Sequence, residues 1–212
     1  GNAILAYRGS ESMGTTEEQL RNLQHDWIDA DLGILNADGD TKTTNQYIEA
    51  RNFLSENKDL INGYDNIYLT GHSLGGNLAE FSTIVSEDCG VGDNFERCVS
   101  FDGPGFSDEF IEHYADAISK NASKIDHYKW SIVGSILNDL PGENSMFIKV
   151  KTDAVKNPIG RHSTSSIDFD DNGNVQKGRQ DFLAFIVEKF TKLTDKLPGF
   201  VGNTIAAIVA EG

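Results

Sequence analysis

The sequence has few of the features that stabilise or target several classes of protein. Of its 212 residues only two are cysteine and four are proline, and 18 basic residues face 33 acidic ones, giving a formal net charge of −15. So acidic a surface repels phosphate, which argues against nucleic acid as a partner and against strong binding to anionic membranes, but leaves neutral lipid interfaces open. No apolar run approaches the ~18 residues of a membrane span. No signal peptide is evident, so the location of the protein stays open.

The two cysteines and the start of the chain bear on disulfide pairing and on the extent of the domain. Cys89 and Cys98 lie nine residues apart in one loop region. We expect two unpaired thiols rather than a small-loop disulfide, and so low a count does not identify a redox compartment. The chain begins abruptly on an apolar strand, which indicates a domain cut from a longer protein. Nothing in the sequence indicates an oligomeric state.

What is present suits one turn-rich α/β domain that spans residues 1–212. Apolar residues make up 38% of the chain, and there are 21 glycines. Strands and helices are expected to alternate, which predicts a mainly parallel sheet with helices on both faces. The expected strands are 3–7, 66–70, 98–101, 129–136 and 146–151, and the expected helices are 15–28, 45–60, 76–85, 107–120 and 180–193.

The most informative segment is Gly71-His72-Ser73-Leu74-Gly75, between an expected strand and an expected helix. The pattern Gly-x-Ser-x-Gly is weak alone, but a strand–turn–helix context makes it the nucleophile elbow of the α/β-hydrolase fold. It predicts Ser73 as the nucleophile, at a helix N-terminus that favours developing negative charge. A phosphate-binding loop would need a lysine that is missing. The plain alternative is a tight turn, and His72 is expected to pack against the first strand.

A serine nucleophile needs a histidine base, which in this fold follows it in the chain. Three histidines qualify by order. His113 falls inside an expected helix, and His127 sits just before an expected strand, at the wrong edge of the sheet. His162 follows the last expected strand through a loop and is therefore the favoured base, the alternative being an ordinary loop histidine.

The base also needs an orienting acid. Asp102 ends an expected strand and opens the loop Asp102-Gly103-Pro104-Gly105, so its carboxylate should emerge at the catalytic edge. It is our first choice, although it could instead cap a turn. Asp126 precedes the next expected strand and Asp139 lies well after it, and both remain alternatives.

Four segments together resemble the lipase class 3 family and its bacterial lipase-like relatives. They keep their order from Ala3 to about His162, and the family normally has further helices and strands before this point. The segments are Ala6-Tyr7-Arg8-Gly9-Ser10, Asp26-Trp27-Ile28-Asp29-Ala30-Asp31, Tyr68 to Gly76, and Phe101-Asp102-Gly103-Pro104-Gly105-Phe106.

The resemblance implies a set of roles for particular residues. His162 takes the family's late histidine position, and the backbone N–H groups of Ser10 and Leu74 form the oxyanion hole. The fungal members usually carry the acid after the next strand, where this chain has Ser131. The implied substrates are lipid esters such as acylglycerols or phospholipids.

The prediction is thus a serine ester hydrolase, of the lipase or phospholipase type, that needs no cofactor. No metal site is convincing, because the loop Asp168 to Gly173 lacks the far acidic residue of a calcium loop and is typical of a hairpin. The segment Glu11 to Asn36 is a candidate lid or acyl pocket. Alternative functions are a small-substrate esterase or thioesterase, a non-catalytic binding domain that keeps the fold, or the lipase module of a larger secreted effector.

Overall fold

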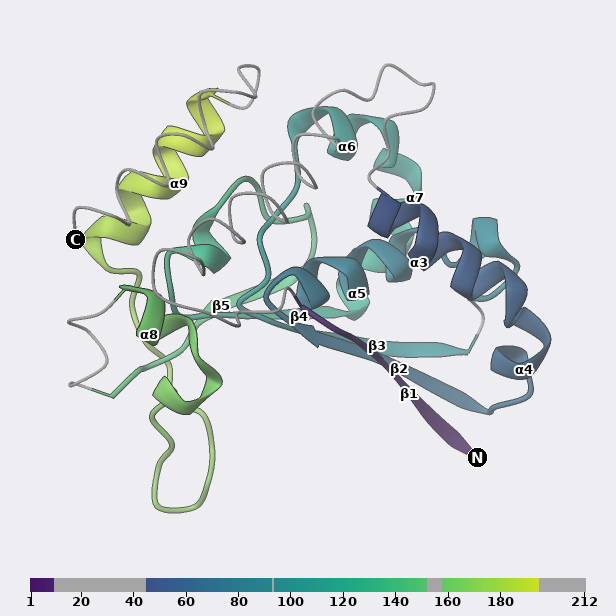
Figure 1. The fold of residues 1–212 in the computed structure, drawn as a ribbon, viewed down its shortest axis with the longest axis horizontal. Helices are drawn as coiled ribbons and strands as arrows, with labels where there is room; N and C mark the ends of the chain where they lie inside the picture. The colour runs from purple at the N-terminus through teal and green to yellow at the C-terminus, as the bar shows by residue number, and fades with distance from the viewer. Residues whose placement is uncertain (10–44, 93, 152–157, 195–212) are drawn as a thin grey trace.

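Five parallel strands form one sheet in chain order (Figure 1). The computed structural model describes residues 1–9, 45–92, 94–151 and 158–194, so the expected helix 15–28 and the candidate lid lie outside it. The all-parallel sheet with flanking helices confirms the expected α/β fold. Its strands are β1 (Asn2–Tyr7), β2 (Asn66–His72), β3 (Phe95–Phe101), β4 (Ile125–Lys129) and β5 (Asn144–Phe147).

The helix that follows the elbow is the centre of the core. Every residue of this helix, α5, is buried, because it lies between the sheet and helix α3. Helices α3, α5 and α7 lie on one face of the sheet in Figure 1, and on the opposite face the end of α8 contacts His72. The α-helices are α3 (Asn45–Glu56), α4 (Lys58–Asn62), α5 (Leu74–Ile84), α6 (Asp108–His113), α7 (Ala115–Asn121), α8 (Pro158–His162) and α9 (Phe182–Thr194).

Strand β2 shows how the sequence directs side chains to the two faces of the sheet. Ile67 and Leu69 are almost fully buried towards α5, whereas Tyr68, Thr70 and His72 alternate with them and are half-buried. This alternation is the period of two expected of a strand. It places the side chain of His72 on the face opposite α5, which matters for the site below. Among the described residues, no helix is long and apolar enough to span a membrane.

One expected strand is wrong in a way that affects the site. The sequence predicts a strand over 129–136, but β4 covers Ile125–Lys129 and is followed by the short 3₁₀ helix η4 (Val133–Ser135). The backbone N–H groups of Trp130 and Ser131 donate to a buried carboxylate, that of Asp102, instead of to a neighbouring strand. Tertiary hydrogen bonding therefore ends the strand early, overriding the apolar pattern that predicts its continuation.

Two expected helices are each interrupted once. The helix expected over 45–60 divides into α3 and α4 at Asn57, whose side chain donates to the carbonyl of Phe53 and competes with the helix backbone. Phe53 near the end of α3 is 45% exposed, whereas the adjacent Leu54 is fully buried. The helix expected over 107–120 divides into α6 and α7 at Tyr114, where ψ reaches 19°.

The remaining expectations have mixed outcomes. Asp170 and Gly173 close the expected turn through a backbone hydrogen bond of 2.9 Å, with Gly173 at φ 79°. Both cysteines are free and buried, as expected, although Cys98 lies in β3 and not in a loop. In α9, Val187 is buried in the core, whereas Phe182 at its start is 79% exposed.

Candidate active site

Ser73 occupies a strained turn between β2 and α5. Its φ of 59° and ψ of −134° are rare for a residue with a side chain, and such strain is concentrated at functional sites. A Cβ on Gly71 would lie 2.1 Å from the carbonyl oxygen of Gly75, and one on Gly75 would lie 2.3 Å from that of Tyr7. Both elbow glycines are therefore required by close backbone approach. The N–H of Ser73 donates to the carbonyl of Phe101, which ties the elbow to β3.

Asp102 and His162 are brought together at the carboxyl edge of the sheet. Oδ2 of Asp102 accepts a hydrogen bond of 2.7 Å from Nδ1 of His162 and another from the hydroxyl of Ser131. Oδ1 accepts from the backbone N–H of Trp130 and of Ser131, at 2.9 and 3.0 Å. The carboxylate is fully buried, yet each of its oxygens has two donors.

These contacts decide the charge of Asp102. Burial alone would raise the pKa of its carboxyl group, but the hydrogen bond from His162, the charge of that ring, and the donors from Ser131 and Trp130 together hold the pKa below its ordinary value. Asp102 is therefore ionised at neutral pH. An ionised acceptor requires a proton on Nδ1 of His162, which leaves the lone pair on Nε2.

The side chain of His72 contacts His162 and Trp130, and its expected packing against the first strand stays a prediction. Its Nε2–H donates to the carbonyl of His162 at 2.9 Å, and the two rings stack with centroids 4.5 Å apart. The ring of His72 also stacks on that of Trp130, with the two centroids 5.8 Å apart. Burial, and then the charge of His162, lower the pKa of His72, which keeps it a neutral donor. The alternation of β2 explains this, because His72 points to the face at which α8 arrives.

One contact expected of a catalytic triad is not formed. Nε2 of His162 is buried and makes no hydrogen bond with the described residues, so the expected bond to the hydroxyl of Ser73 is not formed. The two residues are nevertheless neighbours through His72, which precedes Ser73 in the chain and stacks on His162. Nε2 is the ring nitrogen left for a substrate or for the serine proton.

The other candidate bases and acids lie elsewhere. His113 is exposed at the end of α6, and His127 lies inside β4, so its expected position before a strand is wrong. Asp126 pairs with Arg97, and Asp139 accepts from Lys129 at 2.6 Å. Among the described aspartates considered, Asp102 is the one in contact with His162.

Of the two residues predicted to hold the oxyanion, the structure describes Leu74 but not Ser10. Leu74 is the first residue of α5, so its backbone N–H has no acceptor within the helix, as the predicted oxyanion role requires. Ser10 lies outside the described residues, but Gly9 just before it passes beside the elbow: a Cβ there would lie 3.3 Å from that of Ser73. A cavity of about 350 Å³ opens between the end of β1 and α3, with Arg8 and Gly9 in its wall.

A second polar cluster was not anticipated from the sequence. Glu80, His127 and Glu143 meet in the interior, on the face of the sheet that α5 covers. They come from α5, β4 and the turn before β5, so no local spacing reveals them. One signal was available, because Glu80 is a charged residue in the middle of the otherwise uncharged run from Leu74 to Val85.

Comparison with known proteins gives a family and no activity. A model of the Mbeg1-like family matches residues 41–196. That range is more than half of the chain and contains Ser73, Asp102 and His162. No curated protein matches the chain. The match is extensive enough to place the sequence: the chain belongs to the Mbeg1-like family.

Proposed function

We propose that this protein is a serine hydrolase that cleaves carboxylic esters, with Ser73 as nucleophile, His162 as base and Asp102 as orienting acid. The observation that supports it most is the Asp102–His162 hydrogen bond of 2.7 Å, beside a serine held at φ 59° on a glycine-lined elbow. The three residues come from three separate parts of the chain. Their meeting at one edge of a parallel sheet is the arrangement that serine hydrolysis requires.

The chemistry follows from the protonation of His162. Its Nε2 lone pair takes the proton of the Ser73 hydroxyl as the oxygen attacks the ester carbonyl, and the tetrahedral oxyanion is held by the N–H of Leu74 and by Ser10. Collapse expels the alcohol, which receives the proton from Nε2, and water then cleaves the acyl-serine by the same steps. Asp102 stays ionised throughout and stabilises the imidazolium. Attack requires the Ser73 hydroxyl to turn towards Nε2, an adjustment that is common between free and substrate-bound enzymes.

Lipid esters are the proposed substrate class. The support is the resemblance of Tyr68 to Gly76 and of the loop after Tyr7 to class 3 lipases. The net charge of −15 disfavours anionic lipid surfaces, so the lipid would be neutral or presented singly. Small soluble esters and thioesters are the alternative within the same chemistry.

A non-catalytic domain that retains the fold is the second candidate, and one observation favours it. The missing hydrogen bond between Ser73 and His162 is what an inactive relative would also present. Activity measurements separate the two, since a binding domain would neither react at Ser73 nor release alcohol.

The test is covalent labelling combined with turnover. The protein is treated with an alkyl fluorophosphonate and the modified residue is located by mass spectrometry, and p-nitrophenyl esters of several chain lengths are assayed in parallel. We expect labelling at Ser73 and loss of both signals in Ser73→Ala, with Ser123→Ala as the matched exposed-serine control. Absence of labelling, together with turnover that Ser73→Ala does not change, would refute the proposal.

A further inference from the structure

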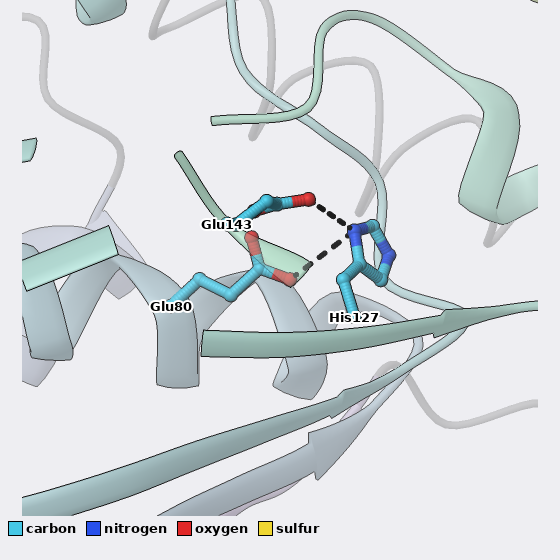
Figure 2. Close-up of side chains that lie close together, drawn as sticks. All are labelled: Glu80, His127 and Glu143. Atoms are coloured by element: carbon cyan, nitrogen blue, oxygen red, sulfur yellow. Dashed lines mark hydrogen bonds and ion pairs between the residues drawn. The ribbon is translucent and has the colours of Figure 1, made fainter. Parts of the chain in front are cut away.

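The buried cluster of Glu80, His127 and Glu143 lies apart from the Ser73 elbow, and ester hydrolysis makes no use of it. Figure 2 shows both carboxylates turned towards one edge of the imidazole ring. All three side chains are at most 1% exposed. One ligand atom from each residue lies within 4.8 Å of the other two.

The histidine is oriented as a ligand would be. Nε2–H of His127 donates to the backbone carbonyl of Gly103 at 2.9 Å, which fixes the ring and leaves Nδ1 facing the carboxylates. Nδ1 lies 3.0 Å from Oε1 of Glu143 and 3.6 Å from Oε1 of Glu80. Metal-binding histidines are commonly held in this way, with the second ring nitrogen donating to a backbone carbonyl.

The carboxylates lack the partners that burial demands. No described residue donates a well-formed hydrogen bond to either oxygen of Glu80 or to Oε2 of Glu143, although all three atoms are buried. The buried hydroxyl of Ser100 lies beside the Glu80 carboxylate and is the weak donor that it has. The nearby amine of Lys129 is already bound to Asp139 at 2.6 Å. Buried acceptors without donors are costly, so the cluster needs a cation or protons to be stable.

We propose that Glu80, His127 and Glu143 bind one divalent transition-metal ion, with zinc as the best chemical match. One imidazole nitrogen and two carboxylate oxygens are a donor set that zinc accepts. Two ionised carboxylates and a neutral imidazole balance the charge of a divalent ion. Donors that share an ion at about 2.0–2.2 Å lie at most about 4.4 Å apart, so a small shift of one carboxylate closes the site.

The role of this ion would be structural. It would join α5, β4 and the turn before β5 at one point in the core, as closed metal sites do. Through the His127–Gly103 hydrogen bond it would also brace the loop that begins with Asp102. Oδ1 of Asp139, 3.9 Å from Nδ1 of His127, is a further oxygen close to the site. The site stands independently of the proposed hydrolase activity.

The competing arrangement is a cluster that is neutralised by protons alone. Burial would lower the pKa of His127, but Glu80, Glu143 and Asp139 raise it to about 9, so an imidazolium could serve in place of a metal ion. In that case Nδ1–H would donate to Glu143 and added metal would find no vacant donors. The two arrangements differ in stoichiometric metal binding, which can be measured directly.

The experiment uses the full chain, stripped with a chelator and then given one equivalent of zinc. Native mass spectrometry should show one bound ion, and the melting temperature should rise on zinc addition. Glu80→Gln should weaken binding at least about 100-fold. The amide resembles the protonated carboxyl, so the metal-free variant should still fold. Glu112→Gln, an exposed glutamate on α6, is the matched control and should bind as the parent does.

Two results would overturn the proposal: no ion retained by the parent protein, or equal zinc binding by Glu80→Gln. If the variant does not fold, titration of the parent with Co²⁺ decides the question. A visible absorption band that saturates at one equivalent supports the site, and its absence refutes it.

Discussion

Replacing Asp102 by asparagine separates the proposed catalytic role of this residue from its structural role. The oxygen of the amide can keep the two backbone donors, the N–H groups of Trp130 and Ser131. Its NH₂ group would then face the hydroxyl of Ser131 and the Nδ1–H of His162, which are also donors. His162 must take its other tautomer to accept from the amide, and Nε2 then carries a proton and cannot act as base.

The two effects differ widely in size. Loss of the productive tautomer is expected to lower kcat by about 10⁴-fold, which is about 5.5 kcal/mol in activation free energy. One disturbed buried hydrogen bond costs about 1–3 kcal/mol of unfolding free energy. Ester turnover and urea unfolding of the Asp102→Asn variant measure the two separately. A folded variant that keeps more than a tenth of parental kcat would refute the assignment of Asp102 as the acid.

The pH dependence of stability supplies a second readout for the same variant. The pKa of Asp102 is lower in the folded protein than in the unfolded chain, where it is about 3.9. Its ionised form therefore stabilises the fold fully above the unfolded value, and this contribution disappears as the pH falls through the folded value. The melting-temperature difference between parent and Asp102→Asn should shrink from pH 6 to pH 3. A parallel loss in both proteins would show that Asp102 does not contribute in this way.

Two further predictions concern the packing around the triad. Gly75→Ala places a Cβ against the backbone at Tyr7, so urea unfolding should show a loss of stability of about 1–3 kcal/mol or more. Gly63→Ala, at φ −73°, is the control and should change the stability far less. Equal losses in the two variants would contradict the elbow geometry. His72→Phe keeps a stacked ring but loses the donor to the carbonyl of His162, so kcat should fall by about tenfold or less. His72→Ala, which also removes the stack, should lower kcat more, and unchanged kcat in both variants would remove His72 from the site.

The elbow could be predicted from the sequence because its causes are local. The spacing of Gly71, Ser73 and Gly75 specifies a tight turn in which a Cβ at either glycine would collide with neighbouring backbone, and the flanking apolar runs specify a strand and a helix. The meeting of Asp102 and His162 could also be anticipated, because the carboxyl ends of parallel strands share one edge. Neither inference requires knowledge of distant side-chain contacts.

What could not be predicted depends on long-range hydrogen bonds. The apolar run after Lys129 predicts a continued strand, but Trp130 and Ser131 leave the sheet to donate to Asp102. The Glu80 cluster assembles residues from α5, β4 and the turn before β5, and its members become neighbours only in the folded chain. Both features were missed for the same reason: a buried carboxylate is stabilised by polar or charged groups from segments that are distant in the sequence.

Ser131 links these observations into one account of the acid. The resemblance to class 3 lipases places the acid after the strand that is β4 here, where this chain has Ser131. Strands β3 and β4 are adjacent and in register, with Phe101 opposite Tyr128, so a carboxylate following either strand reaches the same region. In this chain the carboxylate follows β3, as Asp102, and Ser131 after β4 donates its hydroxyl and its N–H to that carboxylate. A serine at the expected acid position is therefore consistent with the proposed role of Asp102, because Ser131 donates to a carboxylate supplied by the neighbouring strand.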